Sequence, residues 1–170
     1  TFCLKAVERA HLGVALATSL PAEYLDSDAV AIVSRLQREG YTAYLVGGCV
    51  RDLLLGCEPK DFDIGTSASP DECKDVFGRR CRLIGRRFKL AHIRAGAQIF
   101  EVATFRGPPE DQEVVDTSGF VVRANTYGTP EQDAISRDFT MNGLFYDPIA
   151  RKIHDHVGGE TDIQAGTIRT

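Results

Sequence analysis

The sequence predicts an α+β domain in which helices flank a mixed central β-sheet. Apolar residues recur at helical spacing in some segments and alternate with polar residues in others. Short groups of turn-forming residues separate these segments. The chain has 170 residues, 43% of them hydrophobic, which is enough for one domain with its own core. Such an order of helices and strands is typical of a mixed sheet.

The first predicted helix starts at residues 26–28 and ends at Gly40, because Val30, Val33 and Leu36 recur at helical spacing. Residues 1–20 show no clear pattern and are compatible with a frayed arm or a short helix, and residues 1–24 are expected to form an N-terminal arm. The elements predicted next are a strand over 43–46, a helix over 49–55 and a strand over 61–64.

Two capping boxes mark later helix starts. Residues 69–72 begin a helix that runs to about Phe77, and residues 129–132 begin one that runs through about Asn142. The remaining predicted elements are strands over 90–94 and 98–105 joined by a turn at 95–96, a long mobile loop over 107–128, and strands over 144–146 and 153–157.

The charge pattern carries information that the average charge hides. The net charge of −4 and a pI near 5.6 argue against a nucleic-acid-binding domain when the chain is taken as a whole. Residues 79–94, however, contain seven Arg or Lys and no acidic residue. A local basic surface of this kind can bind phosphates despite an acidic total.

Cysteine usage and apolar run length exclude several protein classes. The five cysteines are odd in number and include no C-x-x-C pair, so neither a disulfide framework nor a zinc site is expected. Apolar runs are too short for a transmembrane helix, and the first residues do not resemble a secretory signal. Because the chain starts without Met, we expect a fragment of a longer protein.

The strongest chemical signal is a pair of aspartates in the predicted strand over 61–64. Asp61 and Asp63 would project to the same face, where two adjacent carboxylates repel unless a cation lies between them. A pair of Mg²⁺ ions would satisfy both, as in phosphoryl displacement. A solvated strand edge with two surface aspartates is the alternative that these residues alone leave open.

A glycine turn precedes these aspartates. Gly47 and Gly48 stand between a strand and a helix that carries Arg51, so backbone N–H groups and a guanidinium could approach phosphate oxygens. The spacing matches neither a Walker A loop nor a dinucleotide-binding fingerprint, and a purely structural turn is the alternative.

Two further acidic positions have a functional and a structural interpretation. Glu101 lies in an otherwise apolar strand, where it either faces solvent or is held by a partner. Asp138 and Asn142 would share one face of the helix predicted through 142, which is also the pattern of a solvated helix face.

Taken in order, the segments 47–52, 61–63, 101–106 and 137–142 resemble the head region of class II CCA-adding tRNA nucleotidyltransferases and bacterial-type poly(A) polymerases. Both belong to the DNA polymerase β-like nucleotidyltransferase superfamily. With a closing segment at 155–166, the resemblance extends over residues 25–170. It implies a DNA polymerase β-like catalytic head at 25–170, without the C-terminal neck and RNA-binding helices of the family.

The resemblance also implies roles for single residues. Asp61 and Asp63 would bind the metals, with Glu101 as the third acidic residue and Asp138 as part of the active site. Ser136 departs from the family, which commonly has an arginine there, and this weakens one expected contact. The residues implied to bind the nucleotide are Gly47, Gly48, Arg51, Arg137, Asp138 and Asn142.

Two activities remain open within the resemblance. The basic segment with Arg86, Arg87 and Lys89 is similar to that of poly(A) polymerases and favours poly(A) over CCA addition. These three residues are weak candidates for RNA binding, with a solvated strand edge as the alternative. His92 is a further candidate phosphate contact, although a structural role is favoured for it.

The implied reaction transfers AMP from ATP to an RNA 3′ end and releases pyrophosphate, with two Mg²⁺ ions, or Mn²⁺ in their place. The implied compartment is the cytoplasm for a bacterial-type protein, or an organelle for a eukaryotic one. CCA addition from CTP and ATP is the alternative activity, and a non-catalytic nucleotide- or RNA-binding module is the alternative of another class.

Overall fold

The computed structural model of the chain describes residues 20–85, 89–108, 113–115, 121–123 and 126–170. Its centre is a seven-stranded sheet with the strand order β3-β4-β5-β2-β1-β8-β9. In this sheet β2 and β5 are parallel and every other neighbouring pair is antiparallel, so the predicted mixed sheet is confirmed. The strands are β1 (Ala43–Val46), β2 (Asp63–Thr66), β3 (Cys81–Ile84), β4 (Leu90–Ala95), β5 (Gln98–Thr104), β8 (Leu144–Asp147) and β9 (Lys152–Asp155).

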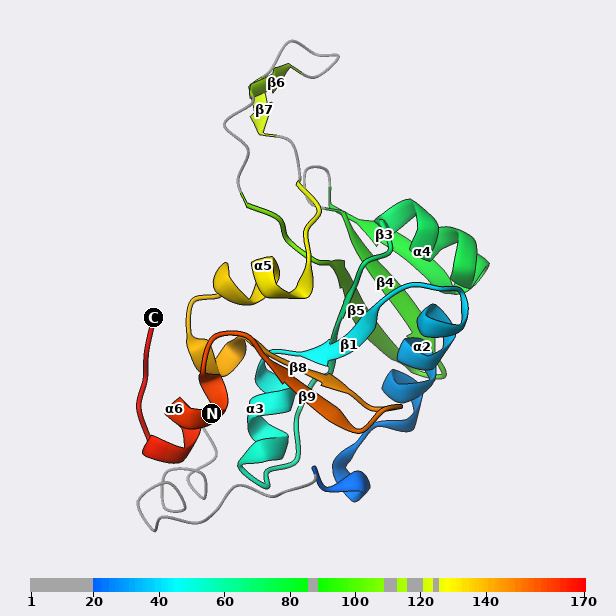
Figure 1. Cartoon of the computed structure of the whole chain (residues 1–170). Coiled ribbons are helices and arrows are strands. Elements are labelled where there is room, and N and C mark those ends of the chain that lie inside the picture. The colour runs from blue at the N-terminus through cyan, green and yellow to red at the C-terminus, as the bar shows by residue number, and fades with distance from the viewer. Residues whose placement is uncertain (1–19, 86–88, 109–112, 116–120, 124–125) are drawn as a thin grey trace.

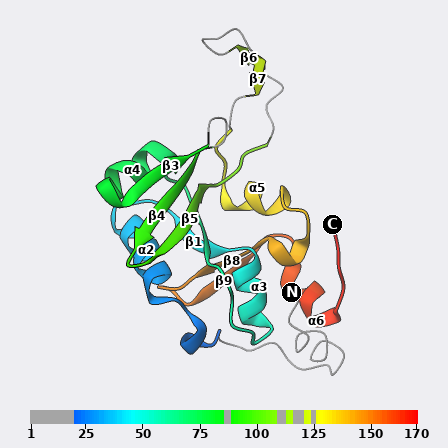
Figure 2. The same cartoon turned by 180° about the vertical axis from the view of Figure 1, so that it is seen from behind.

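Helices flank the sheet, with α4 and α6 at opposite ends of it in both views (Figures 1 and 2). The predicted helices at 26–40, 49–55 and 69–77 are confirmed within one or two residues, as is the 95–96 turn. Asp26 caps the first of these helices, and Ser69 and Glu72 form the predicted capping box of another. The helices are η1 (Ala22–Tyr24), α2 (Ser27–Arg38), α3 (Gly48–Leu54), α4 (Pro70–Phe77), η2 (Gly78–Arg80), α5 (Pro130–Ile135), η3 (Thr140–Asn142) and α6 (Gly159–Ala165).

The two faces of the sheet are covered differently. Alternate residues of a strand point to opposite faces, so Leu45 packs with the buried side chains of α2, α3 and α4, whereas Val46 packs with Phe105, Ala134 and Phe145 under α5. The first cluster is the main core. The second is small and covers only the part of the sheet beside α5, which leaves the same face of β3, β4 and β5 exposed.

The prediction of a long loop over 107–128 is wrong in one respect. It contains β6 (Glu113–Val115) and β7 (Val121–Arg123), which pair as a separate antiparallel two-stranded sheet that projects away from the rest of the molecule (Figure 1). Both strands are rich in valine, a β-branched residue that favours extended backbone. The low overall periodicity of the segment concealed this signal.

The helix predicted from 130 to about 142 is also wrong, because α5 ends at Ile135. Ser136 donates its hydroxyl to the backbone carbonyl of Asp133, and Asp138 accepts the backbone N–H of Phe139 with its own carboxylate. Such local side-chain bonds compete with the helical pattern. The chain turns here before η3 begins at Thr140.

Two strand boundaries differ from the prediction. Strand β2 begins at Asp63, so Asp61 precedes the strand and does not share its alternation. Strand β9 ends at Asp155, whose carboxylate accepts the backbone N–H groups of Val157 and the three residues after it. These bonds satisfy N–H groups at the start of α6, a helix that, like β3, the sequence did not predict.

Other expectations concern the chain start and the cysteines. The predicted arm lies mostly outside the described residues, but Leu20 is buried in the main core and Tyr24 packs against it. The described cysteines, Cys49, Cys57, Cys73 and Cys81, are free and buried. Within the described part of the chain, no helix has both the length and the apolar character needed to cross a membrane.

Gly65 lets β2 pass directly beneath a buried aromatic ring. A Cβ atom at Gly65 would lie 2.8 Å from Cε1 of Phe105, whose side chain is buried. We expect Gly65→Ala to lower the free energy of unfolding by about 1–3 kcal/mol, because extra volume in a packed site forces neighbours to shift. Urea denaturation measures this. In a Phe105→Leu background the loss should shrink, and an unchanged loss would contradict the explanation.

Candidate active site

Three acidic side chains form the carboxylate cluster at the centre of the site: Asp61, Asp63 and Glu101. Glu101 lies on β5, and the parallel register pairs Ile64 with Val102. Asp63 and Glu101 each precede this pair by one residue, so they lie side by side on the same face of the sheet. Asp61 joins them from the loop before β2 rather than from the strand, and Asp61 and Asp63 are not related by strand alternation.

The charges in this cluster influence one another. Partial burial raises the pKa of Asp63, the neighbouring Glu101 and Asp61 carboxylates raise it further, and Arg137 opposes them. Repulsion between like charges and desolvation both disfavour the ionised form. The cluster is therefore a place where an added cation would relieve unfavourable interactions.

The glycine turn brings two arginines to the backbone beside this cluster. Gly47 has φ +78°, and a Cβ there would lie 3.4 Å from Nη1 of Arg137. A Cβ at Gly48 would lie 3.4 Å from Nη2 of Arg51. Because glycine has no side chain, two guanidinium groups from different elements can approach the turn. The segments 47–52 and 137–142 therefore meet here.

A hydrogen-bond chain connects the remaining candidate residues. Arg51 donates from Nη1 to Oδ1 of Asn142 at 2.8 Å and from Nε and Nη2 to Asp52. Asn142 in turn donates from Nδ2 to Oδ1 of Asp138 at 3.2 Å. Asp138 and Asn142 do come together as predicted, but through the turn before η3 and not along one helix.

Asp133 is a residue that the sequence analysis missed. Its side chain is 3% exposed and accepts from Nη2 of Arg137 at 2.8 Å, while its other oxygen accepts the backbone N–H of Arg106 at 3.4 Å. This pair holds Arg137 against the glycine turn. The i,i+4 spacing of Asp133 and Arg137 was the signal that could have identified it. Among the described residues, Nε of Arg137 is buried without a hydrogen-bond partner.

The basic candidates are only partly described. Arg86 and Arg87 lie outside the described residues. Lys89 lies 3.9 Å from the Asp71 carboxylate at the start of α4 and is not brought to the carboxylate cluster. His92 is brought there, because its Nε2 lies 3.6 Å from Oε1 of Glu101.

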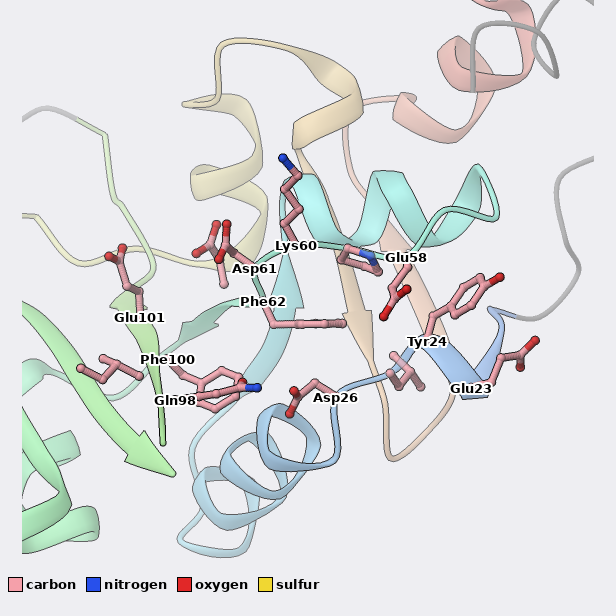
Figure 3. A pocket seen from close by; sticks show the side chains of 14 residues that line it. Glu23, Tyr24, Asp26, Glu58, Lys60, Asp61, Phe62, Gln98, Phe100 and Glu101 are labelled. Atoms are coloured by element: carbon pink, nitrogen blue, oxygen red, sulfur yellow. The ribbon is translucent and has the colours of Figure 1, made fainter. Parts of the chain in front are cut away.

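A pocket of about 590 Å³ opens beside the carboxylate cluster. Figure 3 shows the carboxylates of Asp61 and Glu101 at one end of it, with the rings of Phe62 and Phe100 between them and α2. Its other charged lining residues are Glu23, Asp26, Glu58, Lys60 and Asp63, so the pocket is predominantly acidic.

Carboxylate oxygens are the ligands that Mg²⁺ prefers. Within the described ranges, no three His, Cys, Asp or Glu side chains are already arranged to hold one metal ion together. Mg²⁺ is commonly bound by one or two carboxylates together with substrate phosphates and water. The carboxylate cluster fits this mode, with the phosphates completing the coordination.

Comparison with known proteins adds an independent line of evidence. A family model described as "Poly A polymerase head domain" matches residues 43–169. Poly(A) polymerase I of Haemophilus influenzae is 50% identical over 147 residues, which are 84% of this chain and 32% of that protein. The CC-adding tRNA nucleotidyltransferase of Halalkalibacterium halodurans is 36% identical over 141 residues, 83% of this chain and 32% of that protein.

The fold is shared with solved structures. A Bacillus stearothermophilus CCA-adding enzyme in complex with CTP matches with a TM-score of 0.65 and 36% identity, over 84% of this chain and 32% of that one. The predicted nucleotidyltransferase head fold is therefore confirmed. The chain spans about a third of the length of the curated relatives it matches.

Proposed function

The chain belongs to the poly(A) polymerase head-domain family, and on this premise we propose that it is the catalytic head of an RNA nucleotidyltransferase. The proposed reaction transfers AMP from ATP to an RNA 3′-hydroxyl and releases pyrophosphate. The observation that carries the proposal is the placement of Asp63 and Glu101 side by side on neighbouring strands, next to a glycine turn lined by two arginines. The proposed head spans 25–170, after an arm at 1–24.

In this proposal Asp61 and Asp63 hold two Mg²⁺ ions. Mn²⁺ could take their place. When bound, the metal lowers the pKa of the attacking hydroxyl and neutralises charge on the departing pyrophosphate. The raised pKa of Asp63 supports this role, since a cation favours the ionised carboxylate that the protein alone disfavours.

The other residues position the substrates. The backbone at Gly47 and Gly48, with Arg51 and Arg137, orients the triphosphate, because guanidinium groups match phosphate geometry with two parallel hydrogen bonds. Asn142 and Asp138 fix Arg51 through the hydrogen-bond chain that joins them. Glu101 is placed to accept the proton of the 3′-hydroxyl or to position a metal, with His92 3.6 Å from it.

ATP is the proposed nucleotide substrate, and an RNA 3′ end is the proposed partner. The proposed location is the bacterial cytoplasm. Support for ATP comes from the relatives, since the named poly(A) polymerases are 46–50% identical to the chain and the named CC- and CCA-adding enzymes 34–39%. CCA addition is the second candidate, favoured by the fold shared with the CTP-bound enzyme.

The two candidates make different products. Incubation of the full-length protein with Mg²⁺, an oligo(A) primer and ATP is expected to give extended primers, whereas CTP with a tRNA that lacks CCA is expected to give no incorporation. Gel electrophoresis of labelled RNA measures both reactions in parallel. Efficient CTP incorporation into the tRNA would overturn the preference for poly(A) addition.

A further inference from the structure

One exposed face of β3, β4 and β5 carries a row of side chains that leads to the carboxylate cluster. Arg82 pairs with His92, and His92 pairs with Glu101, so all three project from the same face as Asp63. Neighbouring strands are about 4.8 Å apart, so the backbone at Arg82 on β3 lies about 14 Å, or three strand spacings, from the backbone at Asp63 on β2. The row thus begins with a cation and ends at the proposed reaction centre.

A second cation lies next to this row. Arg94 pairs with Ile99, which is 55% exposed and stands two residues before Glu101 on β5. Arg82, His92 and Arg94 together form the cationic sheet face. Within the described part of the chain, no carboxylate forms an ion pair with either arginine. The helix α4 packs on the opposite face, so both guanidinium groups are available to a ligand.

The strand order separates this face from the triphosphate residues. The carboxylate cluster stands at β2 and β5, the glycine turn with its two arginines follows β1 on one side, and the cationic sheet face lies on β4 and β3 on the other. In a phosphoryl transfer the attacking and leaving oxygens are roughly in line. With pyrophosphate leaving toward the glycine turn, the attacking hydroxyl must arrive from the β5 side.

We propose that the phosphate backbone of the RNA, just upstream of its 3′ end, lies on the cationic sheet face and is bound by Arg82 and Arg94. The proposal rests on the proposed function, which supplies the RNA. Ile99 offers an apolar contact for a base or sugar between Arg94 and the carboxylate cluster. Single-stranded nucleic acids are typically held in this way, by cations along the backbone and by apolar or aromatic contacts to the bases.

The salt dependence of RNA binding tests this assignment. The double variant Arg82→Gln/Arg94→Gln removes two cations from the full-length protein, and fluorescence anisotropy with a labelled oligo(A) strand measures Kd over a range of KCl. Each phosphate contact to a single strand contributes about 0.7 to the slope of log K against log salt, so the slope should fall by about 1.4. At low salt Kd should rise about tenfold or more, while the KM for ATP stays unchanged.

The matched control is Arg38→Gln/Arg151→Gln, which removes the same charge from the end of α2 and from the β8–β9 turn. The proposal would be overturned if the salt slope fell equally in the control, or if it did not fall in Arg82→Gln/Arg94→Gln. A raised KM for ATP with an unchanged slope would assign the two arginines to the triphosphate instead. Competition by poly-glutamate as effective as that by RNA would point to an acidic protein partner.

The binding assay is independent of catalysis, so it also distinguishes the two proposals. Repeating it with Asp63→Asn, which is expected to bind RNA without extending it, tests the surface even when no transfer occurs. If the wild-type protein transfers no AMP but the salt slope of RNA binding still falls in Arg82→Gln/Arg94→Gln, the proposed function is overturned and the RNA-binding surface is not.

Discussion

Asp63→Asn is expected to reduce AMP transfer by about 10²- to 10³-fold while the protein remains folded. Asparagine keeps the shape of the side chain but cannot supply the charge that holds a metal ion beside Glu101. Loss of one preorganised group that stabilises the transition state commonly costs about 10²–10³ in rate. Labelled ATP incorporation into oligo(A) measures the rate, and circular dichroism monitors the fold.

The same variant has a predicted effect on stability. The pKa of Asp63 is raised in the folded protein, chiefly by burial and then by Glu101, so the folded state binds this proton more tightly than the unfolded state does. The contribution of Asp63 to stability is therefore greatest at low pH and decreases as pH rises through the ordinary pKa and then the raised one. Above that window Asp63→Asn should melt at the same temperature as the wild type or higher.

Metal binding gives a readout that does not depend on activity. Added Mg²⁺ should raise the melting temperature of the wild type, because a ligand that binds only the folded state stabilises it. It should raise that of Asp63→Asn much less. Wild-type transfer rates in the variant, or equal Mg²⁺ shifts in both proteins, would contradict the assigned role.

Asp133→Asn is expected to cost about 3–5 kcal/mol of unfolding free energy, because it removes the buried carboxylate that forms an ion pair with the largely buried Arg137. It should also raise the KM for ATP, since Arg137 is then no longer held against the glycine turn. Chemical denaturation and initial rates at varied ATP measure the two effects.

A double variant separates folding from function. Asp133→Asn/Arg137→Gln removes both charges and should recover much of the stability, because loss of a whole buried pair costs far less than loss of one partner. The KM for ATP should remain high. Asp162→Asn is the matched control: this buried aspartate pairs with Arg169, which is 65% exposed and can return to solvent. It should cost less stability and leave the KM for ATP unchanged.

Much of this site could be predicted from local sequence. The glycine turn with Arg51 suggested phosphate binding, and the spacing of Asp61 and Asp63 suggested metal binding. Glu101 was assigned only through the resemblance to the family, and its strand β5 is the neighbour of β2 in the sheet. The helices α2 and α4 had caps and periodicity that tertiary contacts did not override.

The parts that escaped prediction depend on contacts distant in sequence or on local competition. The hydrogen bonds of Ser136 and Asp138 to nearby backbone end α5 early, although the capping box at its start was correct. The role of Asp133 depends on the approach of Arg137 to Gly47, about ninety positions earlier in the chain. No periodicity encodes that approach, because it arises where β8 pairs beside β1.

The central claim is that this chain supplies the chemistry of adenylate transfer to RNA, and a stoichiometric assay tests it most directly. The full-length protein is incubated with Mg²⁺, oligo(A) and ATP, and AMP incorporated is counted against pyrophosphate released, beside Asp63→Asn. One pyrophosphate per AMP added in the wild type, and neither product in the variant, is the predicted result. Equal incorporation in both proteins, or RNA binding without any incorporation, would contradict it.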